Sequence, residues 1–119
     1  MTGPQQVRRG EIYWVDFHPA RGSEQKGRRP ALVVQNDIGN RLSSLTILVA
    51  LTTRIPETIP PQQALVPAVT SGLPRDSVAK CDQLLTADKS RLLDRAGKVD
   101  AATMEAVDDA LRFSLALER

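Results

Sequence analysis

The sequence predicts an α+β fold, in which a small, strongly curved antiparallel sheet of about five to seven short strands precedes a C-terminal helix. Short runs of β-branched, aromatic and aliphatic residues recur along the chain, as expected for strands. Glycine and proline separate these runs, and the last segment has apolar residues at helical spacing. A chain of 119 residues supports one core, so we expect a flexible tail over residues 1–8 and a single domain over residues 9–119.

The first half of the chain contains three expected strands. Glu11–Phe17 mixes β-branched and aromatic residues that suit a largely buried surface. Ala31–Gln35 follows Pro30, which fits a strand start because no ladder donor is needed there. Leu45–Leu51 is apolar on both faces, as a central strand should be. Between the last two strands, residues 37–44 could hold one helical turn or a loop.

The middle of the chain is expected to be less regular. Pro56, Pro60 and Pro61 exclude a helix over residues 55–62 and suggest a mobile connection. Short strands are expected around Ala64–Val66 and Asp76–Cys81, separated by the turn-forming sequence SGLPRD. These two runs bring the recognisable strands to five.

The chain is expected to end in a helix. Asp100 can cap its N-terminus, and Val99 can pack on Met104 as a hydrophobic staple. Gly97, within the charged sequence DRAGK, indicates a break before the helix. The apolar face is wide and must dock on a sheet or on a partner. It consists of two neighbouring stripes, Met104, Val107, Leu111 and Leu115 beside Ala106, Ala110, Phe113 and Leu117.

Composition excludes several classes of function. Sixteen basic and 14 acidic side chains give a net charge of +2, so the distribution of charge matters more than its total. The single cysteine, Cys81, excludes an intrachain disulfide framework, and no apolar run is long enough to span a membrane. One histidine and one cysteine cannot build a zinc cluster, and a ribonuclease mechanism with two histidines is excluded by count. We therefore expect a soluble, cytoplasmic protein without metal or cofactor.

The segment between the first two strands is polar, punctuated by glycine and mostly cationic. It contains Arg21, Lys26, Arg28 and Arg29, and the only acid among them is Glu24. A loop that is held by its own hairpin is a common position for a binding site. The sequence therefore predicts that an anionic ligand meets the N-terminal half of the chain.

A spaced pattern runs through this loop and its flanking strands. It reads DxxP followed by G-x-E-Q-x-G-x-R-P, with Asp16, Pro19, Gly22, Glu24, Gln25, Gly27, Arg29 and Pro30 at the fixed positions. The pattern resembles the active-site loop of the MazF/PemK family of toxin endoribonucleases, and the resemblance extends from residue 9 to residue 117. It implies an SH3-like barrel with a terminal helix, in agreement with the α+β prediction.

The resemblance implies the toxin component of a type II toxin–antitoxin system. Such a toxin would be a sequence-specific, metal-independent endoribonuclease that cuts single-stranded mRNA and inhibits translation. The 2′-hydroxyl of the RNA would attack the adjacent phosphorus and yield a 2′,3′-cyclic phosphate and a 5′-hydroxyl. The family also implies a homodimer and a MazE-like antitoxin with an acidic, disordered C-terminal tail. DNA would be contacted only indirectly, through the antitoxin complex.

Four residues are candidates for catalysis. Arginine presents a fixed fork of donors to phosphate, and Arg29 matches the catalytic arginine of the family. Thr52 ends the third strand and matches the second catalytic position, where its hydroxyl would donate to a phosphoryl oxygen. A shift of one residue in this match would select Thr53 instead. Glu24 and Asp82 are the carboxylates available as the proton acceptor.

The triplet CDQ at residues 81–83 resembles the PemK branch, in which this aspartate is the proposed general base. That branch has an arginine two residues earlier, where this chain has Lys80, which keeps the charge but loses the bidentate geometry. The difference favours a mechanism centred on Arg29 and Thr52. Gln83 is the preferred reader of an RNA base. Further RNA contacts are expected from Phe17, Arg21, Ser23, Gln25, Lys26, Arg28, Asn36, Thr53, Arg54 and Lys80.

Two other functions are compatible with the same fold class. A toxin of the gyrase-poisoning CcdB type would bind a protein target without catalysis, and it would need neither Arg29 nor Thr52. A passive RNA-binding barrel would interleave aromatic with basic residues, but the chain has only two Phe, one Tyr and one Trp. The endoribonuclease is therefore the leading hypothesis.

Overall fold

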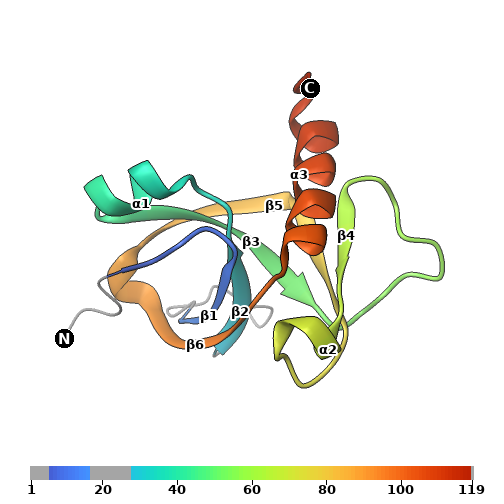
Figure 1. Ribbon diagram of the computed structural model, residues 1–119, viewed down its shortest axis with the longest axis horizontal. Coiled ribbons are helices and arrows are strands. Elements are labelled where there is room, and N and C mark those ends of the chain that lie inside the picture. The colour runs from blue at the N-terminus through green and yellow to red at the C-terminus, as the bar shows by residue number, and fades with distance from the viewer. Residues whose placement is uncertain (1–5, 17–27, 119) are drawn as a thin grey trace, which may run out of the picture.

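The computed structural model describes residues 6–16 and 28–118. The strands are β1 (Glu11–Asp16), β2 (Arg28–Val33), β3 (Leu45–Thr52), β4 (Gln63–Val66), β5 (Ser77–Asp88) and β6 (Leu92–Lys98). The helices are α1 (Asp37–Leu42), α2 (Ala68–Ser71) and α3 (Ala101–Leu115), with a 3₁₀ turn, η1 (Lys89–Arg91). The strands form one sheet in the order β4-β5-β3-β2-β1-β6, with every neighbouring pair antiparallel (Figure 1). The α+β prediction is confirmed.

Both faces of the sheet carry buried apolar side chains. The face toward α3 holds the larger core, in which Ile12, Val49 and Val107 are fully buried. The alternation of side chains along each strand sends the neighbouring residues to the other face. Val7 is only 4% exposed there, so the packed chain begins before residue 9. The core on this second face consists of Val7, Tyr13, Val15, Ala31, Val33, Leu48 and Leu92.

Strand β2 begins earlier than the sequence predicts, and Pro30 lies inside it. Pro30 pairs with Trp14 of β1, whereas the pairing of β2 with β3 begins only at Ala31. The first three residues of β2 therefore have one neighbouring strand. Proline is tolerated at such an edge because its missing N–H needs no partner there. The predicted start at Ala31 was wrong for this reason.

The end of the sheet also differs from the prediction. β5 continues to Asp88, beyond the end predicted at Cys81, and β6 occupies the segment where the sequence predicts a break. β6 lies at the sheet edge, so its charged side chains Asp94, Arg95 and Lys98 stay exposed. Charged residues are common on edge strands because they discourage pairing with other chains. Because of these charged residues, the strand cannot be predicted from the pattern of apolar residues in the sequence.

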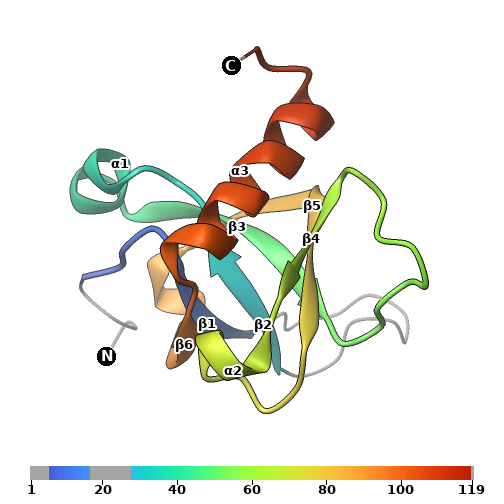
Figure 2. The same ribbon diagram turned by 45° about the vertical axis from the view of Figure 1, so that its right-hand side comes forward.

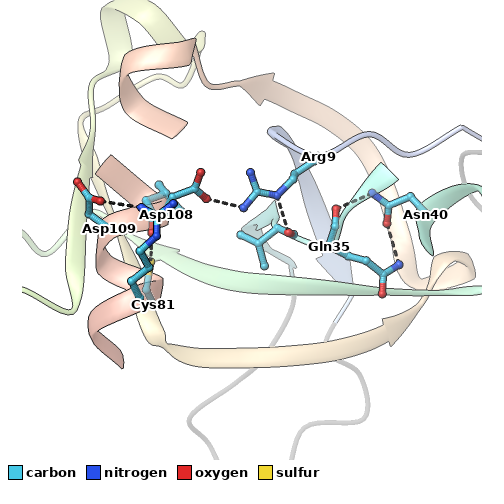
Figure 3. Close-up of polar contacts among 9 residues, drawn as sticks. Arg9, Gln35, Asn40, Cys81, Asp108 and Asp109 are labelled. Atoms are coloured by element: carbon cyan, nitrogen blue, oxygen red, sulfur yellow. Dashed lines mark hydrogen bonds and ion pairs between the residues drawn. The ribbon is translucent and has the colours of Figure 1, made fainter. Parts of the chain in front are cut away.

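Residues 37–42 form helix α1, which was the helical alternative for that segment. Asn36 caps it, since its side-chain oxygen accepts a hydrogen bond from the N–H of Gly39 at 2.8 Å. Asn40 is buried and exchanges side-chain and backbone hydrogen bonds with Gln35 (Figure 3). Its Oδ1 also accepts from the hydroxyl of Thr46 at 2.7 Å, which fixes α1 to the start of β3.

Arg9 ties the start of the chain to its last helix (Figure 3). Its guanidinium donates to the Asp108 carboxylate at 2.5 Å and to the Val34 carbonyl at 2.7 Å. Its backbone N–H donates to Asp37 at 2.7 Å. This bond and a second one from Asn40 lower the pKa of Asp37.

Helix α3 begins as the sequence predicts. Asp100 accepts a hydrogen bond from the N–H of Thr103 at 2.9 Å, and Val99 and Met104 pack in the same core. The helix lies against β4 and β5, whereas its last turns extend beyond the sheet (Figures 1 and 2). In the described chain no helix is both long and apolar enough to cross a membrane.

Candidate functional site

Two predicted catalytic residues lie at the same edge of the site, Arg29 at the start of β2 and Thr52 at the end of β3. Ala31 of β2 pairs with Ala50 of β3. Arg29 lies two residues before Ala31 on β2, and Thr52 lies two residues after Ala50 on β3, so the alternation of side chains places both on the face of the two alanines. Arg29 is also paired with Val15 of β1, which is almost completely buried. The sheet therefore places a guanidinium and a hydroxyl on the same face at one of its ends.

A surface cavity of about 490 Å³ contains both side chains. Its lining includes three cations, Arg29, Arg54 and Lys80, and none of its described lining residues is acidic. Positive charge concentrated in a concave surface raises the local concentration of a polyanion. Within the described ranges, no three His, Cys, Asp or Glu side chains are grouped so that they could hold a metal ion. The complete lining is Arg29, Ala50, Leu51, Thr52, Arg54, Lys80, Gln83, Leu84 and Leu85.

Thr52 is anchored through its oxygen. Its Oγ1 accepts a hydrogen bond from the backbone N–H of Arg54 at 3.2 Å. A hydroxyl carries one proton in addition to its two acceptor positions, so this contact orients the side chain without using the O–H as a donor. Thr53, the next residue, is exposed and does not line the cavity.

Residues 81–83 form a bulge in β5. Val49 of β3 pairs with Leu84, but the next residue, Ala50, pairs with Lys80. Three residues of β5 therefore have no partner on β3. Such bulges redirect side chains and are frequent beside functional sites.

The bulge gives its three residues different environments. Cys81 points toward α3, with its Sγ 3.9 Å from the carbonyl oxygen of Val107 (Figure 3). Burial, aided by the nearby Asp82 carboxylate, raises the pKa of Cys81 to about 12, so its thiol is not a nucleophile at neutral pH. Gln83 lines the cavity with Arg29, whereas Asp82 is exposed and does not line it.

The other predicted contacts occupy a wider area. Arg28 is exposed and precedes Arg29 in β2, where it pairs with Asp16. Asn36 lines a different groove, between α3 and the end of β2, and its side-chain oxygen is used in the cap of α1. Six predicted residues lie outside the described part of the chain: Phe17, Arg21, Ser23, Glu24, Gln25 and Lys26.

A second cavity, of about 400 Å³, adjoins the first through Thr52, Arg54 and Lys80. It also contains residues that the sequence prediction missed, among them Gln63, which pairs with Lys80 across β4 and β5. The strand around residues 64–66 was expected, but only its register with β5 places Gln63 beside Lys80. The missed residues are Ile55, Pro56 and Gln63.

Comparison with known proteins assigns the chain to a family. Residues 8–115 match the PemK-like, MazF-like toxins of type II toxin–antitoxin systems. Endoribonuclease EndoA of Bacillus subtilis (strain 168) is 46% identical over 111 residues, which cover 93% of this chain and 96% of that protein.

Two solved structures have the same fold. An endoribonuclease in complex with its cognate antitoxin, from Mycobacterial species, gives a TM-score of 0.76 at 26% identity, over 95% of this chain and 98% of that one. A MazE–MazF complex from Deinococcus radiodurans gives a TM-score of 0.76 at 25% identity, over 95% of this chain and 99% of that one. The chain therefore belongs to the PemK/MazF family of type II toxin–antitoxin toxins, and it is an endoribonuclease.

Proposed function

We propose that this toxin cuts single-stranded mRNA at specific short sequences, without a metal ion, by using the 2′-hydroxyl of the RNA as the nucleophile. The observation that carries the proposal is the convergence of Arg29, Thr52 and Gln83 in one cationic cavity. Cleaved messages cannot be translated in full, so the activity would stop protein synthesis. The buried, unpaired Cys81 fits action in a reducing cytoplasm.

Because the RNA supplies its own nucleophile, the main task of the protein is to supply hydrogen-bond donors to the phosphate. The 2′-oxygen forms a bond to phosphorus as the bond to the 5′-oxygen breaks, so one product carries a 2′,3′-cyclic phosphate and the other a 5′-hydroxyl. The proton of the 2′-hydroxyl passes to a base, and the leaving 5′-oxygen takes up a proton. Negative charge grows on the phosphoryl oxygens during this step, where the Arg29 fork and the Thr52 hydroxyl would donate.

Two carboxylates are candidates for the base. Asp82 lies in the bulge outside the cavity, and Glu24 lies in the segment that the structure does not describe. The pH dependence of single-turnover cleavage by Asp82→Asn and Glu24→Gln separates them. The variant that loses the acidic limb of the profile identifies the proton acceptor.

The activity is tested by incubating the purified protein with a long RNA in EDTA and sequencing the 5′ ends of the products. Recurrent cuts at one short sequence are expected. A substrate with a 2′-deoxy sugar on the 5′ side of the scissile phosphate should stay intact, since it lacks the nucleophile. Cleavage that stops in EDTA and returns with magnesium would overturn the mechanism. A chain that leaves RNA uncut in every condition would contradict the proposal, whereas the comparisons already disfavour the non-catalytic, CcdB-like alternative.

We also propose that a MazE-like antitoxin restrains the toxin through an acidic, disordered tail. Arg28, Arg29, Arg54 and Lys80 present positive charge beside apolar residues at one end of the sheet, which suits an acidic and partly apolar peptide. Any contact with DNA would then come from the antitoxin. The tail peptide should compete with RNA, and its competition should weaken as salt rises. An antitoxin that blocks cleavage while RNA still binds normally would contradict this model.

The toxin is further proposed to act as a homodimer. The end of α3 and the residues directly after it expose Phe113, Leu115 and Leu117, which are 60, 49 and 57% accessible. Three large apolar side chains on a projecting helix end are costly to leave in water. An isologous contact through this surface would bring together two copies of the chain and two cationic sites.

A further inference from the structure

The first cavity lies over a small residue of the sheet. Ala50 of β3 lines this cavity and is half-buried, so a bound molecule can reach its side chain. On its face of the sheet Ala50 pairs with Ala31 of β2, which is fully buried, and with Lys80 of β5. The alternation along β3 places the longer side chains of Leu48 and Thr52 before and after it on the same face. The sheet surface is therefore lowest at Ala50.

Longer side chains surround Ala50 on this face. Lys80 of β5 pairs with Ala50 and shares its face. Leu85, also of β5, pairs with Leu48 and shares the face too. Between them lies the bulge of β5, whose last residue, Gln83, lines the cavity. The ring around Ala50 consists of Arg29, Thr52, Lys80, Gln83 and Leu85, and all five are partly or fully exposed.

This ring suits a nucleobase beside a bound phosphate. A base has two apolar faces and a polar edge, and the bases of single-stranded RNA can be splayed out of their stack. The cavity of about 490 Å³ lies within the range of roughly 300–1,000 Å³ that is usual for ligand pockets. A base that rests on Ala50 and Leu85 would turn its edge toward Gln83, while its phosphate would lie at Arg29.

From this arrangement we infer that Ala50 is a specificity-determining residue, whose small side chain makes room for the base of a nucleotide that flanks the scissile phosphate. The inference rests on the proposed cleavage of RNA and adds where one base of the substrate lies. A longer side chain at position 50 fills this space and lifts the nucleotide away from Arg29 and Thr52. Because the base must leave its stack to enter, the same space excludes a nucleotide that stays paired in a duplex.

The test measures kcat/KM for cleavage, in EDTA, of one RNA that wild type cuts. Ala50→Val and Ala50→Leu should lower kcat/KM by roughly tenfold and a hundredfold, because a displacement of about 1 Å at a reacting group carries a cost of this order. Ala50→Val, the smaller change, decides the result if the leucine variant fails to fold. Urea denaturation shows which variants are folded.

Ala87 offers matched controls for the same changes in size. It is a half-buried alanine of β5 that pairs with Thr46, so it lies on the same face of the sheet as Ala50. It packs against the core of that face and lines neither cavity. Ala87→Val and Ala87→Leu should therefore cleave the RNA like wild type.

A substrate without one base distinguishes a filled space from a damaged site. An abasic ribonucleotide keeps the phosphate and the 2′-hydroxyl and lacks only the base, and it is placed in turn at each position around the cut. At one of the two positions that flank the scissile phosphate, most of the difference between wild type and the Ala50 variants should disappear. At every other position the difference should remain.

Three results would overturn the inference. Folded Ala50→Val and Ala50→Leu that both cleave the intact RNA like wild type would show that no base lies over residue 50. A defect that persists with the abasic nucleotide at both flanking positions would show that residue 50 acts on Arg29 or Thr52 and not on a base. Relief only at a distant position would assign the space to another part of the RNA. A wild type that cuts no RNA in EDTA would refute the proposed function and this inference with it.

Discussion

A Cβ atom built on Gly97 of β6 would lie 2.1 Å from the backbone oxygen of Ser71, the last residue of α2. Real Cβ atoms do not approach an oxygen so closely, so α2 can rest on the edge strand only where that strand has no side chain. The glycine that marks a break in the sequence is therefore a packing position inside a strand, where it pairs with Ile12 of β1.

Gly97→Ala should destabilise the protein by roughly 1–3 kcal/mol, because the clash is with backbone and forces α2 or β6 to move. Urea denaturation measures the change in the free energy of unfolding. Gly39→Ala is the matched control, since the atoms nearest to its added Cβ belong to the side chain of Gln35, at 3.0 Å, and not to backbone. Equal stability of Gly97→Ala and wild type would contradict the contact.

Arg29→Ala should reduce the single-turnover rate of RNA cleavage by a factor on the order of 10²–10³, since it removes the main donor to the phosphoryl oxygens. Arg29→Lys should remain severely impaired because a point charge does not reproduce the fork. Arg28→Ala removes the same charge one residue away, on the other face of β2, and should mainly weaken RNA binding. If Arg29→Ala keeps more than about a tenth of the wild-type rate, the assignment of Arg29 is wrong.

Thr52→Ala should lower the chemical step more than it lowers RNA affinity, because it removes a donor that acts on the developing charge. Thr52→Ser keeps the hydroxyl and should recover most of the rate. Thr53→Ala should have the smaller effect, in line with its position outside the cavity. Single-turnover rates at saturating enzyme show which variant is more impaired. A larger defect in Thr53→Ala would show that Thr53, and not Thr52, is the catalytic residue.

The exposed end of α3 predicts that light scattering at micromolar concentration finds a dimer. Phe113→Glu places a charge in the proposed contact and should weaken dimerisation by about tenfold or more. Val69→Glu is the control, because Val69 is 91% exposed on α2, away from α3, and should leave the mass unchanged. A monomer that cleaves RNA at the wild-type rate would exclude this arrangement.

The carboxylate of Asp100, which caps α3, is expected to stabilise the folded protein less as the pH falls. The N–H of Thr103 holds the pKa of Asp100 below its usual value, so the ionised form is favoured by folding. This contribution is complete above the unfolded pKa of about 4 and disappears as the pH falls through the lower folded value. Asp100→Asn retains a neutral cap, so its melting temperature should lie below that of wild type at pH 6 and converge with it near pH 2. Asp94→Asn controls for the change in net charge.

Local chemistry made much of the fold and site predictable. Asp100 followed by an apolar stripe predicted the start of α3, and the apolar run at residues 45–51 predicted the central strand because both of its faces are covered. The loop pattern, through its resemblance to the MazF/PemK family, led to the prediction that Arg29 binds phosphate. Thr52 was found in the same way, and the structure places both in one cavity, although their catalytic roles stay predictions.

The features that were missed depend on pairing between distant strands. The bulge at residues 81–83 exists only in relation to β3, and it carries β5 past the point where its apolar pattern fades. β6 owes its structure to pairing with β1 and its charges to its edge position, so neither can be read locally. Gln63 is polar, begins a short strand and belongs to no motif, and only its register with Lys80 places it beside the site.

The neighbours of β1 also determine when a newly made toxin can act. Val15 lies between Arg29 on one side and Leu92 on the other, although residue 92 is synthesised long after both. Likewise, the ion pair between Arg9 and Asp108 cannot form until Asp108 has been synthesised. Contacts so distant along the chain form late in folding. A nascent chain on the ribosome therefore lacks β6, which pairs with the strand beside Arg29, until residues 92–98 have been made, and a product that terminates before β6 should be harmless to the cell that made it.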